Sequence, residues 1–212
     1  LPQEMAIPAV LAGESVLLIA PTGTGKTEAV LLPIFSQLIQ KQLKRGIKVI
    51  YITPLRALNR DLLKRLSFWA SKLSITVEVR HGDTEMKLRR KQAISPPDML
   101  VTTPETLQAI LPGSRMRQHL RSVECVVIDE VHELASSKRG IQLTVALERL
   151  REVVGKEFQR IGLSATVGNP EEVAQFIAGT NRGIGIVQAS LAKGYRYTVE
   201  NPMATDSDYD LA

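Results

Sequence analysis

The stretch Ala20-Pro21-Thr22-Gly23-Thr24-Gly25-Lys26-Thr27 decides the fold, because it joins an apolar run to a segment with helical spacing. The apolar run is Val16–Ile19, and the segment with helical spacing is Glu28–Leu43. Strand, glycine-rich turn and helix stand in the order that a phosphate-binding loop requires. The alternative is a glycine-rich turn that only closes a strand against a helix. Ala20 departs from the usual pattern, which begins with glycine at this position.

The residue types in this loop each have a chemical reason. Gly23 and Gly25 let the backbone curl without a Cβ, so that successive N–H groups and the start of the helix face one phosphate chain. Lys26 would reach the β- and γ-phosphates of a nucleotide, and the Thr27 hydroxyl would bind Mg²⁺. The predicted nucleotide-binding residues of the loop are Thr22, Gly23, Thr24, Gly25, Lys26 and Thr27.

Short apolar runs rich in β-branched residues recur along the chain and predict strands that are buried on both faces of a sheet. Segments with helical spacing lie between most of these runs, which favours βαβ units with right-handed crossovers. The predicted fold class is therefore α/β, a mostly parallel twisted sheet with helices on both faces. The predicted strands are Val16–Ile19, Val49–Ile52, Ile75–Val79, Met99–Val101, Val123–Ile128, Ile161–Leu163 and Ile184–Val187, and the helical segments include Glu28–Leu43, Leu55–Lys72, Leu143–Val154 and Pro170–Ile177.

The length and composition predict one globular unit. A chain of 212 residues, 44% hydrophobic and 23% charged, can bury one sizeable core but not two full enzymatic domains. The strand and helix pattern fades after Val187, so residues 1–190 are expected to form the domain and residues 191–212 a linker or the severed start of another domain. A formal charge of +5 favours anionic partners without identifying one.

No window of the sequence has the length of uncharged apolar residues that a membrane span needs, and the first residues lack the features of a secretion signal. A cytoplasmic protein without a membrane partner is therefore expected. The single cysteine, Cys125, lies in an apolar run and is expected to be a buried thiol. Tyr51 and Trp69 also lie in apolar segments, and core packing is expected for both.

Two adjacent carboxylates, Asp129 and Glu130, follow the apolar strand that ends at Ile128. Strand ends of one direction share an edge in a parallel sheet, so this acidic pair is expected to face the phosphate loop. Alternation of side chains would let Asp129 hold Mg²⁺ while Glu130 activates a water molecule, as a catalytic base does. The alternative is an acidic helix cap without a metal. His132 is either a structural histidine or a residue that couples this site to another element.

A third strand end carries Ser164-Ala165-Thr166, which follows Arg160–Leu163. The hydroxyls of Ser164 and Thr166 could hydrogen-bond to the acidic pair or to a moving partner domain. By itself this triplet is weak evidence, because many loops contain one.

Together these motifs resemble a known family. Ala20–Thr27, Asp129–His132 and Ser164–Thr166 are similar to motifs I, II and III of superfamily 2 DExH-box helicases, in that order. Within the superfamily the chain resembles the large helicase-related (Lhr-like) family, with Ski2-like helicases as the nearest competitor. The resemblance rests on Asp129–Gly140, Leu147–Leu150 and Gly162–Asn169, with support from Tyr51–Asn59 and Arg80–Thr84.

The resemblance implies the first RecA-like domain of a P-loop NTPase, with ATP and Mg²⁺ as cofactors, and it implies further site residues. Gln3 resembles the glutamine that reads adenine. Thr53–Asn59 resembles motif Ia and Thr102–Thr106 resembles motif Ib. Both motifs are associated with the phosphate backbone of a bound DNA or RNA strand, and both stretches lie where a helix begins after a strand. The alternative is two ordinary capped loops. The implied nucleic-acid-binding residues are Pro54, Arg56, Thr103, Pro104 and Glu105.

The function that these motifs predict is ATP hydrolysis coupled to nucleic-acid unwinding, with a role in DNA repair or recombination suggested by the family. By resemblance, the arginines that complete the site belong to a second RecA-like domain in cis, so this domain alone is expected to be inactive. Another P-loop phosphotransferase, such as a small-molecule kinase, and a nucleotide-gated scaffold without turnover are the alternatives from other classes. The basic run Lys87–Lys91 is either a nucleic-acid contact or a solvated helix surface.

Overall fold

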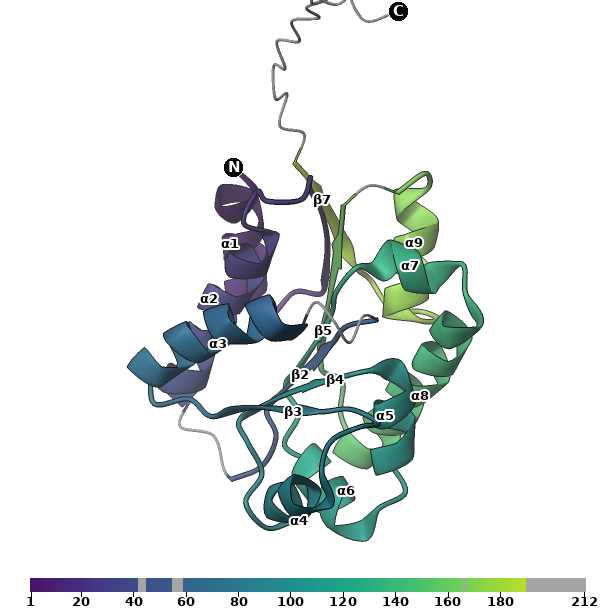
Figure 1. Cartoon of the computed structure of the whole chain (residues 1–212). Helices are drawn as coiled ribbons and strands as arrows, with labels where there is room; N and C mark the ends of the chain where they lie inside the picture. The colour runs from purple at the N-terminus through teal and green to yellow at the C-terminus, as the bar shows by residue number, and fades with distance from the viewer. Residues whose placement is uncertain (42–44, 55–58, 166, 190–212) are drawn as a thin grey trace, which may run out of the picture.

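The strands that the structure describes all pair in parallel within one sheet, in the order β3-β4-β2-β5-β6-β1-β7 (Figure 1). This computed structural model describes residues 1–41, 45–54, 59–165 and 167–189. The predicted α/β class is confirmed. The strands are β1 (Val16–Ile19), β2 (Val49–Ile52), β3 (Val77–Arg80), β4 (Met99–Thr102), β5 (Cys125–Ile128), β6 (Gln159–Ser164) and β7 (Gly185–Gln188).

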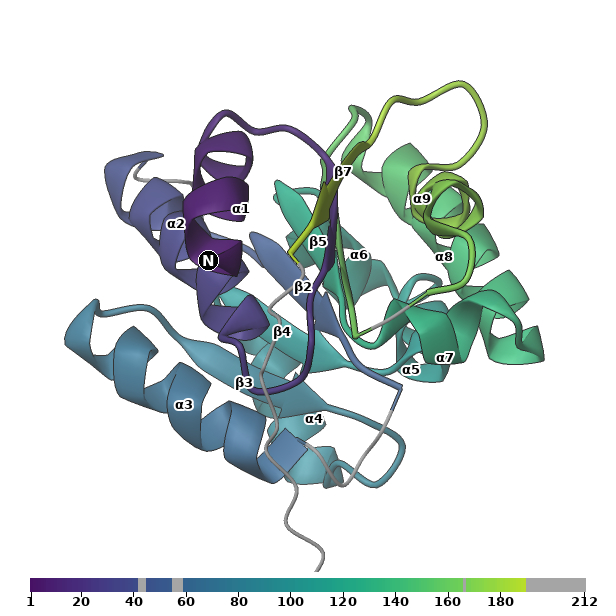
Figure 2. The ribbon, with the colours of Figure 1, turned by 90° about the horizontal axis from the view of Figure 1, so that it is seen from above.

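The helices cover the two faces of the sheet in two groups (Figure 2). The first group is α1, α2 and α3, and the second group is α4 to α9. Alternate residues of each strand face opposite sides of the sheet. Tyr51 of β2 therefore packs against the first group, whereas its neighbour Ile50 packs against the second. In the second group α4 lies beside α6. The helices are α1 (Pro2–Leu11), α2 (Lys26–Lys41), α3 (Asn59–Lys72), α4 (Met86–Ile94), α5 (Pro104–Ile110), α6 (Ser114–Leu120), α7 (Val131–Ala135), α8 (Lys138–Val154) and α9 (Pro170–Ala178).

Burial differs between the centre and the edges of the sheet. Every residue of β1, β2, β4, β5 and β6 is buried, as predicted. The prediction of burial on both faces is wrong for β3, which is half-buried, and for β7, which is mostly exposed. Both are edge strands, where neighbouring strands and helices cover less of the surface.

Some helix boundaries differ from those that the helical spacing of the sequence predicts. Helix α8 begins at Lys138, before the predicted Leu143, because the Ser137 hydroxyl accepts a hydrogen bond from the Gly140 amide (3.2 Å) and caps a first turn that carries little apolar pattern. Residues 42–44 and 55–58, at the ends of two predicted helices, lie outside the described residues. So do Arg56, Thr166 and the predicted linker, residues 191–212.

The expectation of core packing is wrong for Trp69. Its side chain is 40% exposed and packs edge-on against Phe68, with 5.2 Å between the ring centroids. The inward positions of α3 are Leu62, Leu66 and Ala70, one helical turn apart, so the residue before Ala70 points away from the sheet. Cys125 is buried, as expected. None of the described helices is long and apolar enough to cross a membrane.

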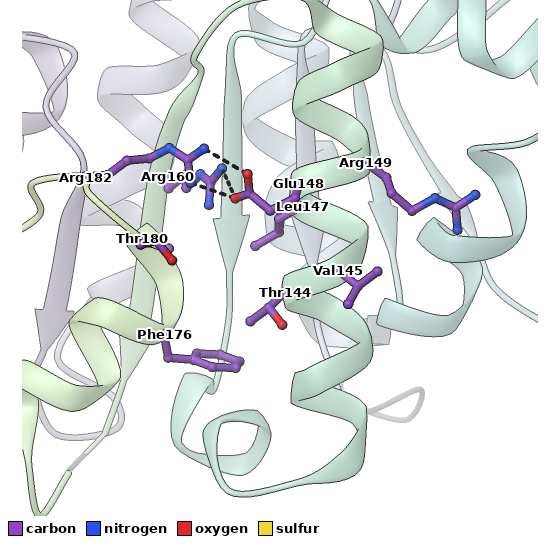
Figure 3. A pocket seen from close by; sticks show the side chains of 10 residues that line it. Thr144, Val145, Leu147, Glu148, Arg149, Arg160, Phe176, Thr180 and Arg182 are labelled. Carbon is purple, nitrogen blue, oxygen red and sulfur yellow. Dashed lines mark hydrogen bonds and ion pairs between the residues drawn. The ribbon is translucent and has the colours of Figure 1, made fainter.

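An ion-pair network joins α8, β6 and the loop after α9 (Figure 3). The buried guanidinium of Arg160 donates to the carbonyl oxygens of Ile177 (3.1 Å) and Ala178 (2.9 Å) and to the Glu148 carboxylate (3.0 Å). Arg182 donates to both oxygens of Glu148, at 2.7 and 2.8 Å. Hydrogen bonds from Arg182 and then from Arg160 lower the pKa of Glu148 to about 2. The network lines a cavity of about 430 Å³, but its opposite charges form ion pairs with one another, which indicates a structural role.

Glu148→Gln should lower the free energy of unfolding at pH 7 by about 1 kcal/mol, a small value because Glu148 is half-exposed and screened by water. Because the folded pKa of Glu148 lies below its ordinary value of 4.5, the contribution is complete above pH 4.5 and is lost as the pH falls toward 2. Urea unfolding at several pH values measures both effects. The control is Glu152→Gln, whose exposed carboxylate pairs with Arg151 alone. Equal pH dependence in all three proteins would contradict the assignment.

Candidate active site

A crevice of about 190 Å³ lies where the carboxyl ends of β1, β2 and β5 meet helices α2 and α3. We call it the phosphate crevice. It brings together the glycine-rich loop and the acidic pair, which are far apart in the sequence, as the sheet argument predicts. Its lining residues are Thr22, Gly23, Gly25, Lys26, Thr27, Glu28, Thr53, Leu62, Arg65, Asp129 and Glu130.

The backbone of the glycine-rich loop has the curled shape that the sequence predicts. Gly23 and Gly25 have φ values of 73° and 82°, in the left-handed region where a side chain would be strained. The Thr24 hydroxyl donates to the carbonyl oxygen of Pro21 at 2.8 Å and closes the turn. Helix α2 starts directly afterwards, so its first N–H groups face the loop. The loop is therefore already shaped for an anion.

Lys26 is the cation of this crevice. Its side chain is 8% exposed, and its ammonium group is buried without a hydrogen-bond partner among the described residues. Burial lowers the pKa of Lys26, and the negative charges of Glu130 and Asp129 oppose that shift. A buried, unpaired ammonium group is costly. An anionic ligand in the crevice would satisfy it.

Asp129 is held by donors on both carboxylate oxygens. The hydroxyl of Tyr51 donates to one oxygen at 2.6 Å, and the amide of Glu130 donates to the other at 3.0 Å. Tyr51 is fully buried, and this burial, followed by the charge of Asp129, raises the pKa of Tyr51, so the phenol keeps its proton. Burial likewise raises the pKa of Asp129, against the effect of these hydrogen bonds and of Lys26.

Core packing was the expected role of Tyr51, and its burial confirms that expectation. The contact of its hydroxyl with Asp129 is not predicted by the sequence. A signal was present, because a buried tyrosine hydroxyl normally finds a hydrogen-bond partner. Its partner could not be named, since β2 and β5 become neighbours only in the folded sheet.

The backbone at Glu130 differs from the strand alternation that the sequence predicts. Strand β5 ends at Ile128, and Glu130 has a left-handed backbone with φ of 47° at the start of α7. This turn, rather than strand alternation, sets the direction of the Glu130 side chain. The Glu130 side chain makes no capping hydrogen bond to α7, so the alternative of an acidic helix cap is not realised. Burial, followed by the charge of Asp129, raises the pKa of Glu130.

His132 lies between the acidic pair and the end of β6. Its Nδ1 atom is 3.0 Å from the Ser164 hydroxyl and 3.6 Å from a carboxylate oxygen of Glu130. This geometry joins two of the three residues predicted to couple the site to another domain, while Thr166 lies outside the described residues. A wider cavity of about 580 Å³ opens beside His132, between α7 and α9.

Gln3 reaches the phosphate loop from α1. Its amide nitrogen donates to the carbonyl oxygens of Thr24 (3.0 Å) and Gly25 (3.2 Å). A Cβ at position 25 would collide with this amide, which explains a second need for glycine there. The side chain for which the resemblance implies an adenine contact therefore also holds the phosphate loop through two hydrogen bonds.

Among the predicted nucleic-acid residues that the structure describes, Thr103 and Glu105 have internal partners. Thr103 is buried, and its hydroxyl caps α5 by accepting a hydrogen bond from the Thr106 amide at 3.4 Å. Glu105 forms an ion pair with Arg139. Pro104 is the first residue of α5 and is buried, as is Pro54. The capped-loop alternative thus describes the Thr103 side chain in this structure.

Comparisons with known proteins find related helicases. The family model described as DEAD/DEAH box helicase matches residues 1–173. The ATP-dependent helicase Lhr-Core of Saccharolobus solfataricus is 40% identical over 95% of this chain, which spans 25% of that protein. The Lhr helicase/probable uracil glycosylase of Mycolicibacterium smegmatis is 40% identical over 95% of the chain, which spans 14% of it. The chain therefore spans a quarter or less of these relatives.

Two solved structures of helicases are also similar to this chain. A structure of the Mycobacterium smegmatis helicase Lhr bound to ssDNA and AMP-PNP is 40% identical and superposes with a TM-score of 0.83 over 92% of this chain and 26% of that one. A structure of the DUF1998 helicase MrfA bound to DNA and AMPPNP is 26% identical, with a TM-score of 0.75 over 88% of this chain and 26% of that one.

Tyr51→Phe tests the contact that orders the acidic pair. Removing the hydroxyl leaves a buried Asp129 oxygen without this donor, so the free energy of unfolding should fall by about 1–3 kcal/mol. The same substitution in an Asp129→Asn background should cost less, because the charged acceptor is already gone. Urea unfolding of the four proteins gives the coupling energy. Additive losses would mean that the hydrogen bond contributes nothing of its own.

Proposed function

Because the chain belongs to the DEAD/DEAH box helicase family, we propose that it is the ATP-binding motor domain of a helicase that couples ATP hydrolysis to unwinding of nucleic acid. The Lhr relatives confirm the resemblance drawn from the motifs. The observation that carries the proposal is the buried ammonium group of Lys26, which has no hydrogen-bond partner among the described residues and lines one crevice with an acidic pair and a loop shaped for phosphate. Residues 1–190 are the proposed RecA-like domain, and residues 191–212 the proposed linker.

The crevice fits a nucleotide with Mg²⁺. Among the described residues, no group of three or more His, Cys, Asp or Glu side chains is arranged to hold a metal alone. Mg²⁺ in nucleotide sites is held by one or two carboxylates together with substrate phosphates and water. Asp129 and the Thr27 hydroxyl are the proposed protein ligands, and the ion would neutralise charge on the phosphates. The AMP-PNP in the two related structures supports ATP as the ligand.

The side chains of the crevice have distinct proposed roles. Lys26 binds the outer phosphates. Glu130 orients the attacking water and accepts its proton, a role favoured by a pKa raised toward neutrality by burial. Gln3 holds the loop in its curled shape and contacts the adenine. His132 and Ser164 transmit the state of the site to a neighbouring domain through their hydrogen bond.

Two partners follow from this assignment. Nucleic acid is the proposed substrate, bound across the loops that begin at Thr53 and Thr103, and the ssDNA and DNA in the related structures support it. A second RecA-like domain in cis is the other partner, since the chain spans only about a quarter of the Lhr-Core relatives. An arginine from such a domain typically contributes 10³ to 10⁵ in rate. The 212-residue chain alone should therefore bind ATP and hydrolyse it negligibly.

Lys26→Ala tests the crevice directly. The substitution removes the one buried ammonium group aimed at the phosphates, so affinity for a fluorescent ADP analogue with Mg²⁺ should fall by roughly two orders of magnitude. The fold should remain, because the lost group has no hydrogen-bond partner among the described residues. Fluorescence titration measures affinity, and circular dichroism measures folding. Lys72→Ala, at the far end of α3, is the matched control; unchanged affinity in folded Lys26→Ala would refute the phosphate crevice.

Glu130→Gln tests the base in the natural full-length polypeptide. It should keep nucleotide affinity but lower ATP turnover by about 10²-fold or more, the effect of losing a general base. Steady-state phosphate release with single-stranded nucleic acid measures the turnover. Glu133→Gln, which changes an exposed carboxylate in α7, should leave turnover within about twofold of the unsubstituted protein. Near-normal turnover in Glu130→Gln would assign the base to another group.

A further inference from the structure

Several exposed arginines lie at the end of the domain opposite the phosphate crevice. Arg45 lies before β2, Arg90 lies in α4 before β4, and the third group lies in α6 and just after it, before β5. Strands β4, β2 and β5 are neighbours, with Val49 in register with both Met99 and Cys125. Three separate segments therefore meet at the amino-terminal edge of the sheet. We call this the basic edge; its residues are Arg45, Arg90, Arg115, Arg117 and Arg121.

Hydrogen bonds hold these segments together. The guanidinium of Arg45 donates to the carbonyl oxygen of Ile94 at the end of α4 (3.3 Å). His119 in α6 contacts the carbonyl oxygen of Ala93 through its Nε2 atom (2.9 Å), and its own carbonyl accepts from the Ile47 amide (3.1 Å). Figure 1 shows α4 and α6 side by side at this end of the molecule. The arginines thus stand on a fixed framework.

The segments that carry the basic edge contain few carboxylates. Residues 86–97 and 112–123 contain no Asp or Glu. Within the described parts of the chain, none of the five arginines of the basic edge forms an ion pair, whereas cations elsewhere do. The nearby acids pair with other cations: Asp98 with Lys48, Glu124 with Lys156 and Glu78 with Lys91. Glu152, which lines a small pocket together with Arg117, pairs with Arg151.

This arrangement is electrostatically unfavourable without a counter-charge. Three neighbouring strands span about 10 Å, similar to the Debye length in physiological salt, so the positive charges repel one another. A chain of phosphates would relieve this repulsion and release its counterions. All five cations are arginines, whose planar guanidinium matches phosphate oxygens in pairs.

We propose that the basic edge is a second nucleic-acid-binding surface, which holds the phosphate backbone of a strand away from the loops at Thr53 and Thr103. The inference rests on the proposed function, because it assumes that the domain acts on nucleic acid. The surface binds without reading sequence, since arginine contacts to phosphate carry no base information. It lies at the edge of the sheet opposite the phosphate crevice, so its occupation leaves the nucleotide site open.

The experiment compares binding of a fluorescein-labelled oligothymidylate by anisotropy over a salt series. Arg117→Gln with Arg121→Gln removes two charges one turn apart on the exposed side of α6. Affinity at low salt should fall roughly tenfold, and the slope of log affinity against log salt should decrease by about 1.4, or about 0.7 for each lost contact. The matched control is Lys64→Gln with Lys72→Gln on α3, which covers the opposite face of the sheet; it should bind within about twofold of the unsubstituted chain.

Each outcome decides a separate point. An unchanged affinity and slope in the α6 variant would overturn the basic edge and leave the proposed function intact. No DNA binding by the unsubstituted chain, with normal ADP binding, would overturn both the surface and the nucleic-acid part of the function. Equal binding of poly-glutamate, lost in the same variant, would assign the surface to an acidic protein instead. A second variant, Arg45→Gln with Arg90→Gln, must repeat the loss, and it serves if the α6 variant unfolds.

Discussion

Parallel pairing of β1, β6, β5 and β2 is the constraint on which the rest of this structure depends. It sends the phosphate loop after β1 and the acidic pair after β5 to one edge, with β6 between them. Two strand spacings are about 10 Å, which leaves room for phosphates between Lys26 and Asp129. The intervening strand ends at Ser164, so the residue that contacts His132 is supplied by the same pairing.

The opposite ends of the sheet carry opposite chemistry. At the carboxyl edge, burial withdraws Lys26, Asp129 and Glu130 from water, so their charges act strongly on one another and on a ligand. At the amino edge, the arginines remain in water, where attraction for a polyanion is long-ranged and depends on salt. The first edge suits precise positioning of reacting groups, and the second suits holding a long, charged strand.

Periodicity and motif order predicted most of the fold. The runs at Val16–Ile19 and Val49–Ile52 match β1 and β2 to the residue, because central strands must be apolar throughout. The same rule fails at β3 and β7, since an apolar run does not reveal whether its strand lies at an edge. The prediction of core packing also fails for Trp69, because this residue lies on the side of α3 that points away from the sheet.

The sequence by itself determined the chemistry of the site: a glycine-rich loop with Lys26 and Thr27, and a strand that is followed directly by Asp129 and Glu130. These depend on local order along the chain, which a motif records. Only the tertiary structure decided that Tyr51 donates to Asp129, that a left-handed turn redirects Glu130, and that three basic segments share an edge. Each of these depends on which strands become neighbours, and that is settled by packing of the whole sheet, because residues far apart in sequence meet only when the core is buried.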